Sequence, residues 1–338
     1  MSGLSLGGGA SAGGFSVSFR GRAIISHDKA RPFLSAGSSS MEYKISHGMF
    51  KMRERNSKLN AVLDWKPRKE SDALVVLESD SFGSVRFVAD GERLRVFFEP
   101  KRSFTRLSVD IRAEPGESVF GCGEQYSYFN LRGKKVPIWV QEQGIGRGFN
   151  AMKFAADIAA HGAGGNKFST YFAMPVFVSS AKYALVAETS AFSEFDFTRR
   201  AVTRLEFHEV PKGLTLLFGD SIEALVSVTA KTCGIQPALP DWVYDGIILG
   251  AQGGTSESLR KIGALEREGA AVCGLWIQDW EGKRVTSFGS QLFWNWEQSS
   301  DMYPKLGATI AELKKRGIRV LGYINTFLAL EGDRKSVV

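Results

Sequence analysis

The sequence has few cysteines, no long apolar run and no concentrated block of positive charge. Its three cysteines, Cys122, Cys233 and Cys273, are odd in number, far apart and include no Cys-x-x-Cys pair. This spacing argues against both a disulfide framework and a zinc site. No stretch of 18 uninterrupted apolar residues is present, so we expect no membrane span.

Positive charge is present but dispersed along the chain. The formal net charge is +7, yet no run of five or more basic residues occurs. The densest basic stretches, at residues 66–69 and 314–316, are short. Proteins that bind nucleic acid usually carry a clustered basic stripe, so we expect no nucleic-acid partner.

The N-terminal residues lack the features of a targeting segment. Residues 1–14 are rich in Gly, Ser and Ala and have neither a basic start nor an apolar core. This composition predicts a flexible tail rather than a signal peptide. The sequence also contains no Asn-x-Ser/Thr sequon. Together these features predict a cytoplasmic protein.

The histidines show no spacing typical of metal ligands. They are His27, His47, His161 and His208. Surface positions or hydrogen-bonded polar roles are therefore expected for them, and we predict no metal site.

Short β-like segments dominate the chain from residue 15 to about residue 217. Phe15–Phe19 alternates apolar and polar residues with period two, whereas Ala73–Leu77 is a continuous apolar run typical of a strand buried on both faces. Asp90-Gly91 indicates a hairpin turn. Many strands with regular turns predict a β-sandwich over residues 15–236. Several glycines in residues 144–167 indicate a long loop.

The pattern changes to alternating strands and helices over residues 237–338. Apolar runs of buried-strand type lie at Gly246–Gly250, Val272–Ile277 and Val320–Ile324. Helical periodicity lies between them, at Thr255–Gly269 and from Pro304 to Gly317. This order predicts a parallel sheet with right-handed crossovers. Barrels of this kind need ~250 residues, so we expect an incomplete (β/α)8 TIM barrel with three β/α units.

Two blocks of motifs carry a resemblance to a known family. The first is Val119-Phe-Gly-Cys-Gly-Glu-Gln125, with Leu131-Arg-Gly133 and Glu142-Gln-Gly-Ile-Gly-Arg147 after it. The second is Trp276-Ile-Gln-Asp-Trp-Glu-Gly-Lys-Arg284, followed by Phe293-Trp-Asn-Trp296 and Tyr323-Ile-Asn325. This ordered set, over about residues 15–330, resembles glycoside hydrolase family 31, in particular its sulfoquinovosidase branch.

The resemblance implies a galactose-mutarotase-like sandwich and retaining hydrolysis of a small α-glycoside, without a cofactor. Such chemistry uses two carboxylates roughly 5–5.5 Å apart. In this family both are aspartates at the ends of later barrel strands, the nucleophile after the fourth. By position, Asp279, Asp301 and Asp333 are therefore not candidates for these roles. The resemblance predicts no catalytic residue within the chain, and hence an inactive chain.

The resemblance also implies which residues contact the sugar. Gln252 and Gln278 follow the first and second barrel strands, where the sulfoquinovosidase pattern carries sugar-contacting residues. In that pattern an Arg followed three residues later by a Trp holds the sulfonate. Here Trp294 matches, but Gln291 occupies the Arg position. An amide cannot replace the charge-assisted, bidentate bonds of a guanidinium, so this position bears on sulfonate specificity. Lys283 or Arg284, from the same loop, could compensate.

The sequence leaves two roles open for Asp279 and for the pair Glu124 and Arg147, and it assigns different roles to two tryptophans. Asp279 is either an acceptor for a sugar hydroxyl or a structural acceptor for loop amides. Trp276 lies within an apolar run and is predicted to be core, while Trp294 is the better substrate platform. Glu124 and Arg147 either form a structural ion pair or reach the mouth of the barrel.

Three functions remain open from the sequence. The chain belongs to an α-glycosidase lineage, or it is a carbohydrate-binding remnant without catalysis. As a third possibility, it is an incomplete gene product without independent function.

Overall fold

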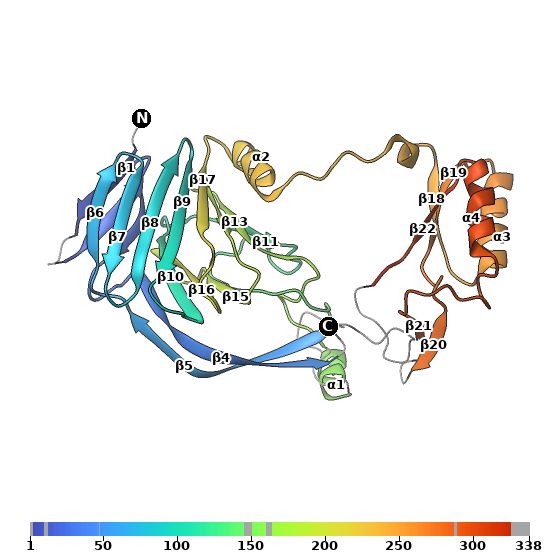
Figure 1. The fold of residues 1–338 in the computed structure, drawn as a ribbon, viewed down its shortest axis with the longest axis horizontal. Coiled ribbons are helices and arrows are strands. Elements are labelled where there is room, and N and C mark those ends of the chain that lie inside the picture. The colour runs from blue at the N-terminus through green and yellow to red at the C-terminus, as the bar shows by residue number, and fades with distance from the viewer. Residues whose placement is uncertain are drawn as a thin grey trace. The chain divides into compact units, whose positions relative to one another are not determined.

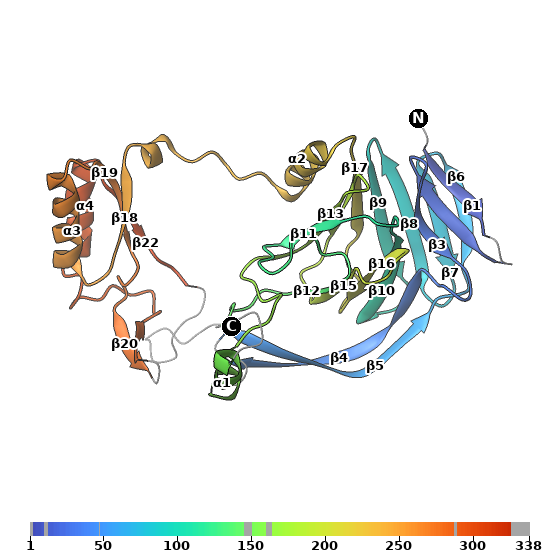
Figure 2. The ribbon, with the colours of Figure 1, turned by 180° about the vertical axis from the view of Figure 1, so that it is seen from behind.

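A computed structural model describes residues 3–9, 13–46, 48–144, 151–159, 164–286 and 289–325. The chain divides between Ile235 and Gln236 into two compact units (Figure 1 and Figure 2). The boundary predicted from the sequence lies one residue later, after residue 236. Each unit has a hydrophobic core of its own.

The described strands of the first unit pair in antiparallel fashion. A six-stranded sheet has the order β12 (Lys135–Ile138), β15 (Ser193–Asp196), β16 (Val202–Phe207), β10 (Arg106–Arg112), β4 (Leu34–Ser46) and β5 (Met49–Ala61). An eight-stranded sheet has the order β11 (Val119–Gly123), β13 (Ala173–Ser179), β14 (Tyr183–Ala187), β17 (Leu214–Phe218), β9 (Arg93–Pro100), β8 (Gly83–Asp90), β7 (Leu74–Ser79) and β6 (Lys66–Ser71). A smaller sheet contains β1 (Leu4–Gly8), β2 (Phe15–Phe19) and β3 (Arg22–His27).

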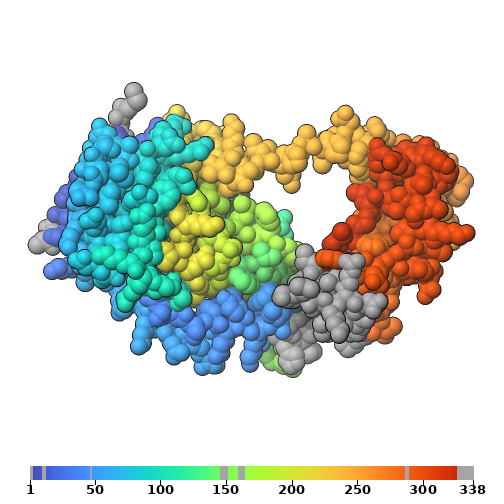
Figure 3. Space-filling model, viewed as in Figure 1, coloured from blue at the N-terminus to red at the C-terminus, as the bar shows by residue number. Residues whose placement is uncertain are grey.

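Side chains alternate between two faces along these strands. On β16, Thr203, Leu205 and Phe207 are buried, whereas Arg204 and Glu206 between them point to the other face. The buried apolar side chains of both large sheets belong to one core cluster. The long hairpin of β4 and β5, 13 residues in each strand, runs along one edge of this unit, in blue in Figure 3.

The N-terminal residues depart from the sequence prediction. Leu4–Gly8 forms β1, which pairs with β2 from Leu4 opposite Phe19 to Gly8 opposite Phe15. The predicted flexible tail is therefore wrong for this segment. Leu4 is buried and Leu6 packs against the same core. These two leucines, on the same face of the strand, attach the otherwise glycine-rich segment to the core. Residues 1–2 and 10–12 lie outside the described residues.

The described residues of the first unit also form the helices α1 and α2. Helix α1 (Ala151–Ala159) lies within the segment that was expected to be a loop, so that prediction is wrong for these nine residues. Residues 145–150 and 160–163 lie outside the described part of the chain. Helix α2 (Ile222–Cys233) begins with Ser221, whose side chain accepts a hydrogen bond from the Ala224 amide as an N-cap. Leu225 of α2 packs on β14 and β17.

The second unit has the predicted alternation of strands and helices. After a 3₁₀ turn (Asp241–Tyr244) come β18 (Ile247–Ala251), α3 (Thr255–Arg267), β19 (Val272–Ile277), the hairpin β20 (Lys283–Thr286) and β21 (Gly289–Leu292), α4 (Leu306–Lys315) and β22 (Arg319–Gly322). The strands β18, β19 and β22 form a parallel sheet in this order. No helix in the described ranges combines the length and apolar character needed to cross a bilayer.

Helices α3 and α4 cover one face of this parallel sheet, as both ribbon views show (Figure 1 and Figure 2). Leu275 and Ile277 of β19 point into the core beneath these helices. Trp276 lies between them in sequence, so its side chain points to the opposite face. It is 38% exposed, so within this chain Trp276 lies outside the core beneath the helices, contrary to the prediction.

A buried carboxylate anchors the first unit. Glu117 is 4% exposed and accepts hydrogen bonds from Arg132, from the Ser179 hydroxyl at 2.8 Å and from the Tyr183 hydroxyl at 3.2 Å. Arg22 lies 3.7 Å from the same carboxylate and 4.1 Å from the centre of the Tyr183 ring. These contacts join the chain before β11 to β3, β13 and β14.

We predict that Glu117→Gln destabilises the chain by about 3 kcal/mol, because it removes the buried countercharge of Arg132 and one of the two countercharges of Arg22, both of which are largely buried. Glu114→Gln is the matched control. Glu114 has a half-exposed side chain 3.6 Å from Arg22, and its loss should cost less than about 0.5 kcal/mol. Urea unfolding followed by circular dichroism measures both variants. Equal effects of the two substitutions would contradict the anchoring role.

Candidate functional site

Two glutamines meet at the carboxyl end of the parallel sheet. Gln252 follows β18 and Gln278 follows β19. The Gln278 amide nitrogen lies 3.4 Å from the Ala251 carbonyl oxygen, which continues the pairing of the two strands. The Gln252 side-chain amide donates a hydrogen bond to the Gln278 side-chain oxygen. The structure therefore brings together two predicted site residues that are 26 positions apart.

A tight turn places Gln252 at this edge. Gly253 and Gly254 follow it with φ of +104° and +92°, a backbone region that favours glycine. A Cβ atom on Gly254 would lie 2.6 Å from the Met302 carbonyl oxygen. The chain can therefore reverse directly after Gln252 and enter α3, leaving the Gln252 side chain exposed.

Asp279 lies beneath the two glutamines and is fully buried, with 0% exposure. One carboxylate oxygen accepts a hydrogen bond from the Gly253 amide at 2.9 Å and lies 3.3 Å from the Lys283 ammonium. The other oxygen accepts a hydrogen bond from the Tyr303 hydroxyl. Both oxygens therefore bind protein groups, one of them a loop amide. This geometry favours the structural interpretation of Asp279 over contact with a sugar hydroxyl.

Tyr303 is the second buried member of this group and was missed by sequence reasoning. Its side chain is fully buried, and its hydroxyl also accepts a hydrogen bond from the Gly254 amide at 3.2 Å. Burial and the neighbouring Asp279 carboxylate raise the pKa of Tyr303, so the hydroxyl stays protonated and donates to Asp279. Tyr303 precedes Pro304, and no local pattern links it to Asp279.

Gln291 and Trp294 lie on and just after the β20–β21 hairpin. Gln291 is exposed on β21 and stands directly opposite Arg284 of β20. Residues opposite each other in an antiparallel pair share one face. The register therefore places the Arg284 guanidinium beside Gln291, which occupies the position of the Arg expected from the sulfoquinovosidase pattern. Lys283, the other cation considered for compensation, instead lies beside Asp279.

Trp294 is half-buried, and its buried Nε1 has no hydrogen-bond partner among the described residues. The segment around it is held by Glu281, which is 5% exposed. The Glu281 carboxylate accepts hydrogen bonds from the Asn295 and Trp296 amides at 2.8 and 3.2 Å. Glu281 also lines a cavity of about 410 Å³ together with Glu297 and Asp301. Sequence reasoning did not identify this anchor.

Two further expectations concern Glu124 and metal ligands. The proposed partner of Glu124, Arg147, lies outside the described residues. Glu124 itself accepts a hydrogen bond from the Tyr126 hydroxyl at 2.5 Å. Among the residues that the structure describes, no group of three or more His, Cys, Asp or Glu side chains is arranged to hold a metal ion.

Comparisons with known proteins agree on one family. The model of the glycosyl hydrolase 31 N-terminal galactose mutarotase-like domain matches residues 13–196. The chain is 34% identical over 325 residues to a sulfoquinovosidase of Escherichia coli and 36% identical over 320 residues to a sulfoquinovosidase of Agrobacterium fabrum. Each match covers 94% of this chain and 48% of the relative.

A solved structure gives the same result. It is a family 31 sulfoquinovosidase from E. rectale in complex with an aza-sugar inhibitor. The match has a TM-score of 0.88 at 33% identity and covers 98% of this chain and 49% of that one. The chain thus spans about half the length of the relatives that it matches. It belongs to glycoside hydrolase family 31 and is similar to the sulfoquinovosidases of that family.

Proposed function

We propose that this chain forms part of a retaining α-glycosidase that acts on a small, sulfoquinovoside-like substrate. In this proposal it supplies the N-terminal sandwich and the first β/α units of a TIM barrel. The contact between Gln252 and Gln278 at the ends of two parallel strands is the observation that supports it most. Barrel enzymes carry their active sites at this end of the sheet.

The uncovered face of the parallel sheet supports the barrel assignment. Ile248, Trp276 and Leu321, one residue from each strand, are 39%, 38% and 36% exposed. The interior of a closed barrel is filled by such layers of bulky side chains. The first strands of a barrel would expose such an apolar face, opposite the helices, until the remaining strands close the barrel over it.

The two glutamines suit a sugar edge chemically. A primary amide both donates and accepts hydrogen bonds, as do neighbouring sugar hydroxyls. Within the pair, one Gln252 donor and one Gln278 acceptor are engaged with each other, and the remaining positions are available to a ligand. Trp294, in the following segment, offers an aromatic face on which a sugar ring can stack.

We infer that the catalytic carboxylates are not among these 338 residues. Retaining hydrolysis needs a nucleophile and an acid/base roughly 5–5.5 Å apart. Asp279 follows Gln278 at the end of β19, but both of its oxygens contact protein groups, from Gly253, Lys283 and Tyr303. Carbohydrate binding without hydrolysis is accordingly the second candidate function for the isolated chain.

The purified 338-residue chain should not hydrolyse a chromogenic α-sulfoquinovoside or a chromogenic α-glucoside. Release of the chromophore measures this directly, with the full-length Escherichia coli sulfoquinovosidase as positive control. A folded chain that binds the sugar without turnover supports the proposal. Turnover that persists through purification would contradict the absence of the carboxylates.

Gln291→Arg should raise the affinity for methyl α-sulfoquinovoside about tenfold relative to methyl α-glucoside, because a guanidinium forms charge-assisted bonds with a sulfonate. Isothermal titration calorimetry measures both ligands. Ser290→Arg adds the same charge one residue earlier, on the other face of the strand, and should leave the ratio unchanged. An equal change in both variants would show general charge attraction instead of a sulfonate contact.

A further inference from the structure

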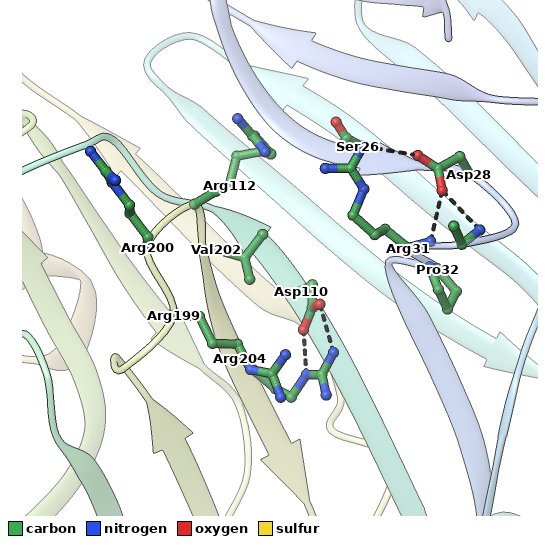
Figure 4. A pocket seen from close by; sticks show the side chains of 12 residues that line it. Ser26, Asp28, Arg31, Pro32, Asp110, Arg112, Arg199, Arg200, Val202 and Arg204 are labelled. Carbon is green, nitrogen blue, oxygen red and sulfur yellow. Dashed lines mark hydrogen bonds and ion pairs between the residues drawn. The ribbon is translucent and has the colours of Figure 1, made fainter. Parts of the chain in front are cut away.

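The first unit contains an arginine-rich cavity that the glycosidase proposal does not use. Its volume is about 470 Å³. Five arginines and two aspartates line it, so the lining carries a formal net charge of +3 (Figure 4). The charged residues are Asp28, Arg31, Asp110, Arg112, Arg199, Arg200 and Arg204.

The register of two strands forms the floor of this cavity. In the pairing of β10 with β16, Asp110 stands opposite Arg204 and Arg112 opposite Val202. These four side chains share the face that points away from the core, because Ile111, between Asp110 and Arg112, is buried. The floor is therefore a fixed part of the six-stranded sheet.

Two loops complete the walls. The loop after β3 is shaped by Asp28, which accepts hydrogen bonds from the Ala30 and Arg31 amides at 2.9 and 2.7 Å. The turn between β15 and β16 contributes Arg199 and Arg200. Five arginines from three separate segments thus line one concave surface.

Three of the five arginines have a carboxylate partner. Arg204 forms a two-pronged pair with Asp110 at 2.6 and 2.8 Å. Arg199 lies 3.3 Å from Asp196, and Arg31 lies 3.5 Å from Asp28. In this part of the first unit, which the structure describes completely, these pairs neutralise much of the local charge.

Arg112 and Arg200 have no hydrogen-bond or ion-pair partner for their guanidinium groups among the described residues. In the view of Figure 4 the side chains of Arg112 and Arg200 extend away from the Arg204–Asp110 pair. Two unneutralised cations in a concave site favour an anion that approaches both.

We propose that this cavity binds a small ligand through an oxyanion group, a phosphate, sulfate or sulfonate. The planar guanidinium presents paired donors that match the oxygens of such a group. A volume of about 470 Å³ is within the usual range for small-molecule sites and leaves room for a sugar-sized body. A nucleic acid or an anionic membrane would require a more extended basic surface.

Isothermal titration calorimetry of the 338-residue chain at constant ionic strength tests this proposal. The probes are inorganic phosphate, sulfoquinovose and uncharged glucose. Arg112→Gln and Arg200→Gln should each weaken phosphate binding about fivefold, and together about 25-fold. Neither substitution removes an ion pair, so both variants should keep the melting temperature of the parent chain. Arg53→Gln, on the exposed part of β5, is the control of equal charge change and should leave binding unchanged.

The two anions distinguish the source of the oxyanion group. If these arginines bind phosphate and not sulfoquinovose, the ligand carries a phosphate group. If they bind sulfoquinovose and not phosphate, the ligand is a sulfonated sugar. The phosphate measurement does not depend on the glutamine pair of the second unit. Failure of the anion-site proposal therefore leaves the proposed glycosidase function intact, and failure of the glycosidase proposal leaves the anion site intact. No binding of either anion, or equal weakening by Arg53→Gln, overturns the proposal.

Discussion

The buried carboxylate of Asp279 is the interaction on which the second unit depends. It holds the Gly253 amide after β18, the Tyr303 hydroxyl before α4 and the Lys283 ammonium at the start of β20. A buried carboxylate without such partners would be strongly destabilising. These three contacts fix the ends of the first two parallel strands, and the glutamines that follow the strands meet as a consequence.

The alternation of side chains along strands connects the other functional features. On β19 it sends Leu275 and Ile277 beneath the helices and Trp276 to the uncovered face. On β10 the same rule buries Ile111 and sends Arg112 to the outer face of the sandwich, into the arginine-rich cavity. The same geometry therefore produces an apolar face in one unit and an arginine-lined face in the other.

Much of the fold could be predicted from local sequence patterns, but little of the tertiary arrangement of the site could. Parallel strands and helices of the second unit were predictable because buried runs and helical periodicity are local signals. The positions of Gln252 and Gln278 at strand ends followed from them. A continuous apolar run does not reveal which face each residue takes, so Trp276 was misassigned. The role of Tyr303 was not predictable, because its partner Asp279 lies 24 positions away.

In the function that we propose, Gln252 and Gln278 form one sugar-binding edge. The most direct measurement follows their side-chain amide resonances by nuclear magnetic resonance while methyl α-sulfoquinovoside is added. Each resonance is assigned by its loss in the Gln252→Ala or Gln278→Ala variant. Both resonances should shift together and saturate with one dissociation constant. Saturation of other resonances while these two stay unchanged would contradict the account.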